Sequence, residues 1–209
     1  MRLLDLYCGE GLAAWGYWLS GRFTEIVGVD IDNQMSARYS FDFINMSAGE
    51  CTYEFLDQFD FIHASPPCQG YSRLTPDQFL HPRLVEATHL MLYASGKPYV
   101  IENVEGSGKD LRPNVVMDGH YFKLPSERRR YFHVSTLKRP LRLMSSGRTI
   151  DMHGGNYVNR RSLIEALGLD VINARRLSNI TMHGMEQGVA PVMTKYIAET
   201  LFPHKALIG

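Results

Sequence analysis

The feature that most constrains the fold is an alternation of apolar, strand-like runs with helical stretches in the first half of the chain. The runs typical of strands are LLDLY (3–7), EIVGVDI (25–31), FDFIHA (59–64) and YVIENV (99–104). Helical patterns lie over LAAWGYWLSG after Gly11 and over residues 83–94, whereas residues 33–54 fit either type. Apolar strands that alternate with helices indicate a parallel sheet covered on both faces. We therefore predict an α/β fold with a doubly wound, mostly parallel sheet.

After residue 104 the alternation weakens. The patterns there predict, in order, a loop at 106–114, a short strand at 115–117, a strand at 129–136, a helix at 162–168 and a last helix at 190–202. Residues 137–160 lack periodicity and contain SSGR and HGGN, which are typical of irregular structure. We therefore expect one main domain, residues 1–136 and 170–209, with a small irregular insertion at residues 137–169.

Length and composition exclude several classes of protein. A chain of 209 residues with 44% hydrophobic residues fits a single ordinary domain with its own core. No apolar run is long enough to cross a bilayer, and the first eight residues meet an acidic residue too early for a secretory signal, so we expect a cytoplasmic protein without a membrane partner. Three cysteines without a CxxC pair argue against a disulfide framework and a cysteine-rich zinc site, and we expect no metal.

The formal net charge of zero conceals an asymmetry between the two halves of the chain. Residues 1–105 hold 6 Lys and Arg against 14 Asp and Glu, a net charge of −8, whereas residues 106–209 hold 16 against 8, a net charge of +8. Part of this excess is a basic cluster, Arg128, Arg129, Arg130, Lys138, Arg139, Arg142 and Arg148. Charges scattered over solvated faces are the alternative, but the asymmetry favours a polyanionic partner for the second half.

The first motif is DLYCGEGLAAWG, residues 5–16, which follows the first predicted strand. Gly9 and Gly11 permit a tight turn and close approach by a ligand, and the following helix offers its N-terminal amides. Asp30 ends the second predicted strand, where an acid in such a sheet can accept hydrogen bonds from ribose hydroxyls. The pair indicates an adenosine-containing cofactor, although a purely structural turn is the alternative. The spacing is not the three-glycine dinucleotide fingerprint, which counts against NAD.

The second motif, ASPPCQGYS at residues 64–72, follows the third predicted strand. It puts Cys68 on a loop at the carboxyl edge of the sheet, where open α/β sheets bind ligands and where a nucleophile belongs. A free cysteine is more commonly a small buried hydrophobic residue. The two prolines before it and the Gln-Gly after it favour the nucleophile, and Cys8 and Cys51 lack such a setting.

Two further motifs carry charged side chains. IENV (101–104) places Glu102 at the end of a strand in the same sheet, where it could donate a proton, although a solvated strand end is the alternative. In SERRRYFHV (126–134), Arg128 and Arg130 would point the same way if both lie on a strand, and two guanidiniums could then clamp a phosphate and a carbonyl oxygen. By itself this pattern is most often a solvated face.

Together and in this order, the four motifs resemble the C5 cytosine DNA methyltransferase family. DLYCGEG is similar to the family's S-adenosylmethionine loop, PPCQGYS to its nucleophile loop, ENV to its catalytic acid, and Arg128 with Arg130 to its arginine motif. EQGVAPVMTKYIAETL near the C-terminus is similar to the family's last motif, without its usual asparagine and second proline. The resemblance implies a Rossmann-like class I methyltransferase fold, with residues 1–136 and 170–209 as the S-adenosylmethionine-dependent catalytic domain.

The resemblance also implies a mechanism. Cys68 would attack C6 of cytosine while Glu102 protonates N3, so that C5 takes the methyl group and then loses its proton. Arg130 would contact the base oxygen, and Arg128 would position the cysteine loop and a phosphate. Since C5 and C6 are hidden in a stacked duplex, the cytosine must be flipped out at a cost of roughly a few kcal/mol.

Binding residues follow from the same resemblance. Those implied for S-adenosylmethionine are Leu6, Tyr7, Gly9, Gly11, Asp30, Ile31, Glu50, Pro67 and Val189. Those implied for the substrate are Gln69, Gly70, Ser72, Asn103 and Arg129, of which the first three would lie in a loop that closes over the base. The arginine motif usually opens with glutamine in this family, where this chain has Ser126.

The implied substrate is cytosine in duplex DNA. Fewer than forty residues, 133–169, stand where members with strict specificity carry a large recognition region, so the chain looks like the short, phage-type members. We therefore expect short or relaxed sequence specificity, and affinity that comes largely from phosphate contacts and falls with salt. The alternatives are tRNA, which a related branch of the family modifies, a free cytosine nucleotide, or a non-catalytic cofactor- or nucleic-acid-binding protein.

Overall fold

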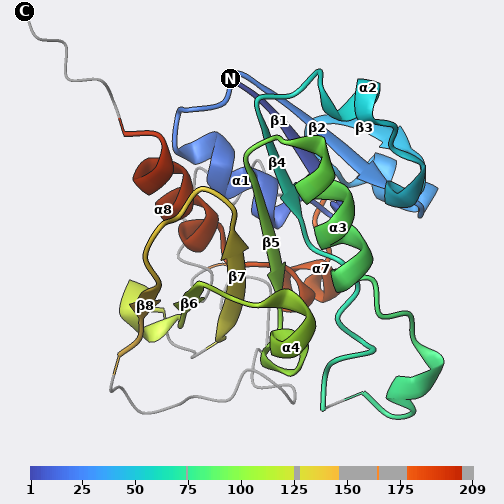
Figure 1. Ribbon diagram of the computed structural model, residues 1–209. Helices are drawn as coiled ribbons and strands as arrows, with labels where there is room; N and C mark the ends of the chain where they lie inside the picture. Colours follow the sequence, from blue (N-terminus) through green and yellow to red (C-terminus); the bar gives the residue numbers. More distant parts are fainter. Residues whose placement is uncertain (74, 125–127, 146–163, 165–177, 204–209) are drawn as a thin grey trace, which may run out of the picture.

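The computed structural model describes residues 1–73, 75–124, 128–145, 164 and 178–203, and an eight-stranded sheet forms its centre (Figure 1). The strands are β1 (Arg2–Leu6), β2 (Glu25–Asp30), β3 (Asp42–Asn45), β4 (Phe61–Ala64), β5 (Tyr99–Asn103), β6 (Val115–Met117), β7 (Arg130–Val134) and β8 (Leu141–Leu143). Their order in the sheet is β3-β2-β1-β4-β5-β7-β6-β8. Strands β1 to β5 are all parallel, β7 runs antiparallel to both β5 and β6, and β8 is parallel to β6. The predicted mostly parallel α/β sheet is confirmed.

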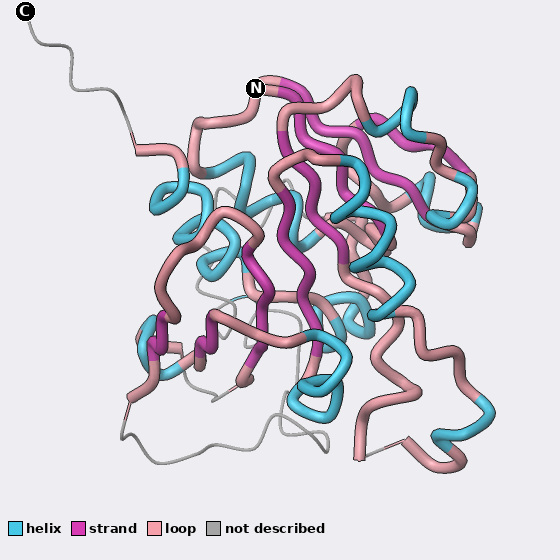
Figure 2. The backbone as a smooth tube through the Cα atoms, in the orientation of Figure 1, coloured by secondary structure: helices cyan, strands magenta, loops and turns pink. Residues whose placement is uncertain are grey.

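Helices cover both faces of the sheet (Figures 1 and 2). The described α-helices are α1 (Leu12–Leu19), α2 (Tyr53–Leu56), α3 (Val85–Ser95), α4 (Gly108–Leu111), α7 (Met182–Gln187) and α8 (Pro191–Leu201). Short 3₁₀ turns are η1 (Asn33–Ala37), η2 (Ala48–Glu50), η3 (Gln78–Leu80), η4 (Glu105–Ser107) and η5 (His120–Phe122). None of the described helices combines the length and the apolar character needed to cross a bilayer.

Alternate residues of the strands belong to two different hydrophobic cores, one on each face of the sheet. On one face, Leu3, Phe61 and Val100 pack with side chains of α1 and α8. On the other face, their chain neighbours, including Leu4 and Ile62, pack with side chains of α2, α3 and α4. Successive side chains of a strand point to opposite faces, so strands buried on both sides must be apolar throughout. This is why the strand-like runs of the sequence are continuous rather than alternating.

Helix α8 docks on α1, although about 180 residues separate the two in the sequence. A Cβ atom built on Gly16 of α1 would lie 1.9 Å from the hydroxyl of Thr194, so only glycine permits this close approach. The Thr194 hydroxyl donates a hydrogen bond to the carbonyl of Ala13 (2.8 Å), which joins the two helices. The last helix therefore completes the layer that the first helix begins.

The second half of the chain differs from prediction in three places. Residues 108–111 form α4 where a loop was expected, because fully buried Leu111 anchors this turn in the core with α3. Residues 141–143 form β8, a strand of the main sheet, where an irregular insertion was expected. Helix α7 was not predicted. The rest of the insertion, the predicted helix at 162–168 apart from residue 164, Arg148 and Ser126 lie outside the described residues.

Candidate active site

A cavity of about 370 Å³ opens at the carboxyl ends of β1, β4 and β5. The turn after β1, the loop after β4, the end of β5, Arg130 of β7 and the segment around Gly188 all contribute to its lining. Ligands of open α/β sheets bind at this edge, and the volume lies within the range of small-molecule sites.

The turn after β1 bends sharply around two glycines. Tyr7, Gly9 and Gly11 all have positive φ angles, of 56°, 50° and 90°. A Cβ atom on Gly11 would lie 2.8 Å from the ring of Tyr39, whereas one on Gly9 would meet nothing within 4 Å. The carboxylate of Asp30 closes the turn, because it accepts a hydrogen bond from the amide of Gly9 (2.9 Å). The predicted glycine turn and acid therefore meet at one wall of the cavity.

Glu10 in the same turn holds the C-terminal part of the chain. Its buried carboxylate accepts hydrogen bonds from the hydroxyl (2.7 Å) and amide of Thr181, the residue that caps α7, and forms an ion pair with Arg38 (3.0 Å). A Cβ atom on Gly184 would collide with this carboxylate, at 2.1 Å. Glu10 thus fixes α7 beside the cavity, and both Glu10 and Gly184 line it.

The loop after β4 presents Cys68 at the cavity. The amides of Tyr71 and Ser72 both donate to the Cys68 carbonyl (2.9 Å each), which makes a tight turn. The side-chain amide of buried Asn103 donates to the carbonyl of Pro66 (2.8 Å) and ties this loop to the end of β5. Arg83 donates to the Gly70 carbonyl (3.1 Å) from the other side. The loop is therefore held on both sides of a half-buried thiol.

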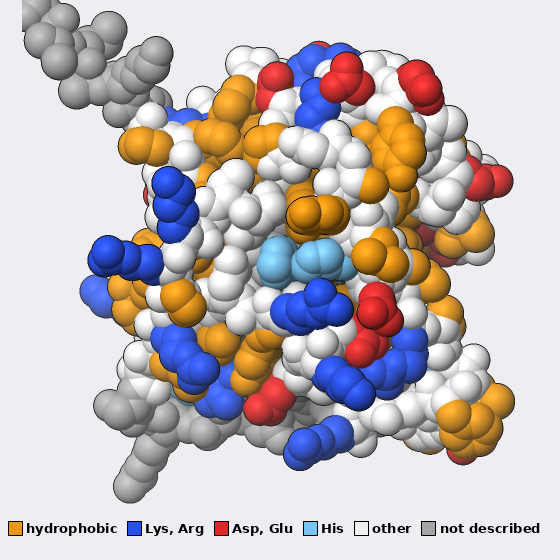
Figure 3. All heavy atoms as spheres, in the orientation of Figure 1, with side chains coloured by type: hydrophobic (Ala, Val, Ile, Leu, Met, Phe, Trp, Pro, Cys, Tyr) orange, Lys and Arg blue, Asp and Glu red, His pale blue; other side chains and the backbone are white. Residues whose placement is uncertain are grey.

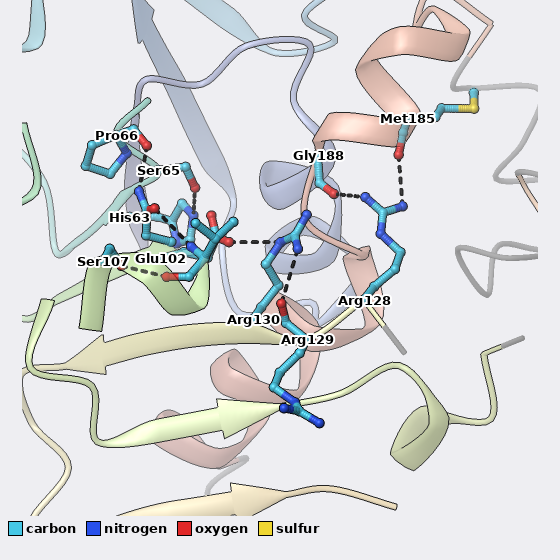
Figure 4. A network of polar contacts seen from close by, with 12 residues as sticks. His63, Ser65, Pro66, Glu102, Ser107, Arg128, Arg129, Arg130, Met185 and Gly188 are labelled. Atoms are coloured by element: carbon cyan, nitrogen blue, oxygen red, sulfur yellow. Dashed lines mark hydrogen bonds and ion pairs between the residues drawn. The ribbon is translucent and has the colours of Figure 1, made fainter. Parts of the chain in front are cut away.

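Glu102 and Arg130 form an ion pair within the same cavity (Figure 4). The Nε atom of Arg130 lies 3.1 Å from Oε1 of Glu102, and the two side chains are only 15% and 8% exposed. Burial is the main cause of a raised pKa for Glu102, which the charge of Arg130, a hydrogen bond from Ser65 and the charge of Arg128 oppose. Burial and the nearby Glu102 also raise the pKa of Cys68, whereas Arg130 lowers it. The pKa values of the Cys68 thiol and the Glu102 carboxyl thus both depend on the charge of Arg130, and that of the thiol also depends on Glu102.

Arg128 does not share the strand of Arg130. Its φ angle of 36° lies in the left-handed region, and β7 begins two residues later. Its buried guanidinium donates to the carbonyls of Met185 (3.0 Å) and Gly188 (2.6 Å), so that in Figure 4 it turns toward α7, away from Glu102. Arg128 and Arg130 therefore do not lie on one strand, which was the condition for their guanidiniums to point the same way. Arg128 instead links the start of β7 to the C-terminal segment.

Most of the predicted site residues meet at the cavity. Those that line it are Tyr7, Gly9, Gly11, Asp30, Ile31, Pro67, Cys68, Gln69, Glu102, Arg130 and Val189. Those that are not among its lining residues are Leu6, Glu50, Gly70, Ser72, Asn103, Arg128 and Arg129. Leu6 is fully buried in the core below the turn, and Glu50 is exposed and accepts a hydrogen bond from the amide of Ser47 in a capping box.

The basic cluster of the sequence is divided in space. Arg130 lies in the cavity, but exposed Lys138 and Arg139 precede β8, which runs parallel to β5, and so they lie toward the opposite edge of the sheet. Arg142 is exposed on β8 itself. In Figure 3, Lys and Arg side chains are spread from the top edge of one face to its lower half rather than gathered in one patch.

Sequence reasoning missed several residues of the cavity. Glu10, Arg38, Ser65, His183 and Gly184 all line it. Glu10 could have been predicted as a cavity residue from its position between Gly9 and Gly11 of the predicted ligand-binding turn. In the part of the chain that the structure describes, no group of three or more His, Cys, Asp and Glu residues could hold a metal ion.

The chain is similar to known methyltransferases in sequence and in fold. A family model described as C-5 cytosine-specific DNA methylase matches residues 1–110. No curated protein matches the sequence. The S. pombe Dnmt2 methyltransferase has a similar structure, with a TM-score of 0.61 at 16% identity over 97% of this chain and 98% of that chain. A mutant of Spodoptera frugiperda DNMT2 gives a TM-score of 0.50 at 21% identity over 70% of this chain, which spans only 55% of that protein.

The structural likenesses, at such low identity, concern the fold, whereas the family model covers slightly more than half of the sequence and includes the glycine turn, Cys68 and Glu102. The chain belongs to the C-5 cytosine-specific DNA methylase family.

Proposed function

We propose that the protein transfers a methyl group from S-adenosylmethionine to C5 of cytosine in DNA, with Cys68 as the nucleophile. The observation that carries this proposal is that Cys68, Glu102 and Arg130 line the same cavity as the glycine turn and Asp30. A nucleophile, a proton donor and a cofactor turn are the parts that such a reaction needs, and the residues named here come from β1, β2, β4, β5 and β7 or the turns that follow them.

The residues of the glycine turn suit an adenosine-containing cofactor. The open space beside Gly9 lets a ligand approach the backbone, and the Asp30 carboxylate offers oxygens to hydroxyl donors. Ile31, Pro67 and Val189 would supply apolar contacts for a ring. When bound, S-adenosylmethionine supplies the methyl group. Glu50, which caps its own turn away from the cavity lining, is a poor candidate for a contact with the adenine.

The chain's own residues would divide the chemistry as follows. The Cys68 thiol gives its proton to solvent and the thiolate sulfur bonds to C6, while protonated Glu102 gives its proton to N3, so that electron density moves to C5. After C5 accepts the methyl group, solvent takes the C5 proton, and the electrons of that C–H bond expel the Cys68 thiolate from C6. The N3 proton then returns to the Glu102 carboxylate, which restores both residues. Arg130 holds Glu102 in place and lowers the pKa of the thiol, which favours the reactive thiolate. Arg128 serves to hold the C-terminal segment against the site.

One experiment tests this function against its alternatives. The protein is incubated with radiolabelled S-adenosylmethionine and duplex DNA, tRNA or dCMP, beside Cys68→Ala and the matched control Cys51→Ala, which removes a buried thiol away from the cavity lining. Transfer to DNA that is lost only in Cys68→Ala supports the proposal. Transfer to tRNA or dCMP alone would mean that the substrate is not DNA. Cofactor binding without any transfer would contradict the proposal that the protein is an enzyme. A covalent adduct with 5-fluorocytosine DNA would identify the attacking sulfur.

Salt dependence tests the expected mode of DNA binding. Because fewer than forty residues, 133–169, stand where strictly specific members of the family carry a large recognition region, we propose that phosphate contacts by Arg and Lys provide most of the affinity and that sequence specificity is short or relaxed. The Kd for duplex DNA should then rise steeply between 50 and 200 mM salt, by roughly tenfold or more. A Kd that stays constant over this range would contradict the proposal.

A further inference from the structure

The proposed nucleophile stands near the start of a long segment that joins β4 to α3. Residues 65–73 and 75–84 of this segment run outward from the end of β4 and return to the start of α3 (Figure 1). Far along it, the side chains of Phe79 and Leu80 are 83% and 70% exposed, so they are not packed in the core. Exposed loops are the more mobile parts of a fold. A fixed thiol therefore needs a contact that separates Cys68 from movements of this exposed part.

The two ends of the segment meet two residues after Cys68. A Cβ atom on Gly70 would lie 2.9 Å from the carbonyl oxygen of Pro82 and 3.0 Å from that of His81. The chain that leaves the nucleophile and the chain that returns to α3 are thus in backbone contact, which a side chain at position 70 would prevent. Arg83 fixes this contact, because its Nη1 donates to the Gly70 carbonyl (3.1 Å).

The guanidinium of Arg83 makes two further contacts at the same time. Its central carbon lies 4.3 Å from the centroid of the Tyr71 ring, and its Nη2 lies 3.2 Å from Oδ2 of Asp110 in α4. A planar guanidinium can stack on an aromatic ring while its edge donates in two directions, which the ammonium of lysine cannot do. Arg83 therefore joins the turn after the nucleophile to α4.

The groups that Arg83 holds together are themselves fixed. Tyr71 is only 3% exposed, and its hydroxyl accepts a hydrogen bond from the amide of Val85, the first residue of α3 (3.2 Å). A Cβ atom on Gly106 in η4 would lie 2.0 Å from the carbonyl oxygen of Tyr71, so η4 packs directly against this backbone. Helix α4, which carries Asp110, is anchored by fully buried Leu111. The arginine thus ties the turn to the core of the protein.

We propose that Arg83 is a positioning residue for the nucleophile, which it holds through Gly70 and Tyr71 with Asp110 as its anchor. This inference rests on the proposed function, in which Cys68 attacks the base. The path from the guanidinium to the thiol is short, because the amide of Tyr71 donates to the Cys68 carbonyl (2.9 Å). The exposed part of the segment lies beyond these contacts, so it moves without displacing the sulfur. Gly70 then belongs to the fixed turn and not to a part that closes over the base.

The first test measures the three thiols of the protein without substrate. In Arg83→Met, iodoacetamide should modify Cys68 several-fold faster than in the wild type, because the loosened turn exposes the sulfur. Loss of a cation by itself would raise the pKa of the thiol and slow the reaction, so the change of charge does not explain a faster one. Cys8 and Cys51 are buried and should keep their wild-type rates. A Cys68 rate at or below that of the wild type, or equal acceleration of all three thiols, would overturn the inference.

The second test measures methyl transfer. Arg83→Met should lower kcat roughly tenfold or more with an unchanged KM for S-adenosylmethionine, since a small displacement of a reacting group is enough for such a loss. Arg83→Lys keeps the charge but not all three contacts, so its kcat should lie between those of Arg83→Met and the wild type. Asp110→Asn should cause a smaller loss, and adding it to Arg83→Met should cause no further loss, because Asp110 acts through the arginine.

Arg112→Met is the matched control, because Arg112 is an exposed arginine whose ion pair with Glu86 is long, at 3.9 Å. It should change neither kcat nor the alkylation of Cys68. A wild-type kcat in Arg83→Met, or in Arg83→Lys and Asp110→Asn should Arg83→Met fail to fold, would overturn the inference. If the wild type transfers no methyl group, the proposed function fails, and the alkylation rates still decide whether Arg83 holds Cys68 in place.

Discussion

Replacing Glu10 with alanine should loosen α7 from the wall of the cavity. The change removes the acceptor of both Thr181 donors and the partner of Arg38. Hydrogen bonds to a charged group contribute roughly 1.5–3 kcal/mol each, so the two Thr181 bonds account for about 3 kcal/mol at the lower end. Arg38 is 36% exposed, so solvent screens its ion pair to at most about 1 kcal/mol. A total near 4 kcal/mol corresponds to a fall in Tm of roughly 8–16 °C for a chain of this size.

Thermal denaturation and hydrogen exchange measure the two parts of this effect. The α7 amides should exchange faster in Glu10→Ala even where the rest of the protein stays folded, because Thr181, which caps α7, loses both of its bonds to the turn after β1. Glu10→Gln, which keeps the shape and one acceptor oxygen, should give a smaller loss. Glu86→Ala is the matched control, since Glu86 is exposed and its contact with Arg112 is long, at 3.9 Å. A Glu10→Ala protein that melts within about 2 °C of wild type, with unchanged α7 exchange, would refute the reasoning.

Three further predictions concern the thiol, the helix contact and the buried histidine. Iodoacetamide should modify Cys68 faster as the pH rises, because the thiolate is the reactive form. At a fixed pH the modification should be slower in Arg130→Met, because loss of the guanidinium raises the pKa of the thiol. An unchanged rate, measured by peptide mass analysis, would contradict this. Gly16→Ala, whose Cβ would lie 2.1 Å from a backbone oxygen of α8, should lose about 1–3 kcal/mol in denaturant titration, while Gly108→Ala, with open space around its Cβ, should lose none. Burial lowers the pKa of His63 to about 3, so burying the neutral ring contributes its full stability above pH ~6.5. Below that pH the free energy of unfolding should fall by up to ~1.4 kcal/mol per pH unit, because the unfolded chain binds a proton that the folded chain does not. The difference between the Tm values at pH 7 and pH 4 should therefore be smaller in His63→Gln than in the wild type.

The parallel half of the fold was predictable because its signals are local. Each of the four strands predicted in the first half of the chain is a short apolar run that ends in polar or turn residues, and each corresponds to one of β1, β2, β4 and β5. Cys68 and Glu102 follow from the same logic, since the carboxyl ends of parallel strands meet at one edge. Helix α8 was predictable from its length and from Pro191 at its start.

The remaining features depend on contacts between distant parts of the chain. Glu10 finds its partner Thr181 171 residues away, and no local pattern announces such a pair. Arg128 follows the period of a strand in sequence, but its left-handed backbone turns it out of the strand before β7 begins. His63 resembles an ordinary strand residue in the sequence, and its hydrogen bonds with Tyr17 of α1 and with Ser65 become visible only in the fold.

The pairing of α1 with α8 has a consequence for synthesis on the ribosome. The parallel strands and α1 leave the exit tunnel first, but the surface that α1 presents to Thr194 and Pro191 stays uncovered until the final helix emerges. A nascent chain in that state exposes an apolar surface of α1 that attracts other chains. Chaperones that shelter this surface should therefore influence the yield of the protein more strongly than its equilibrium stability suggests.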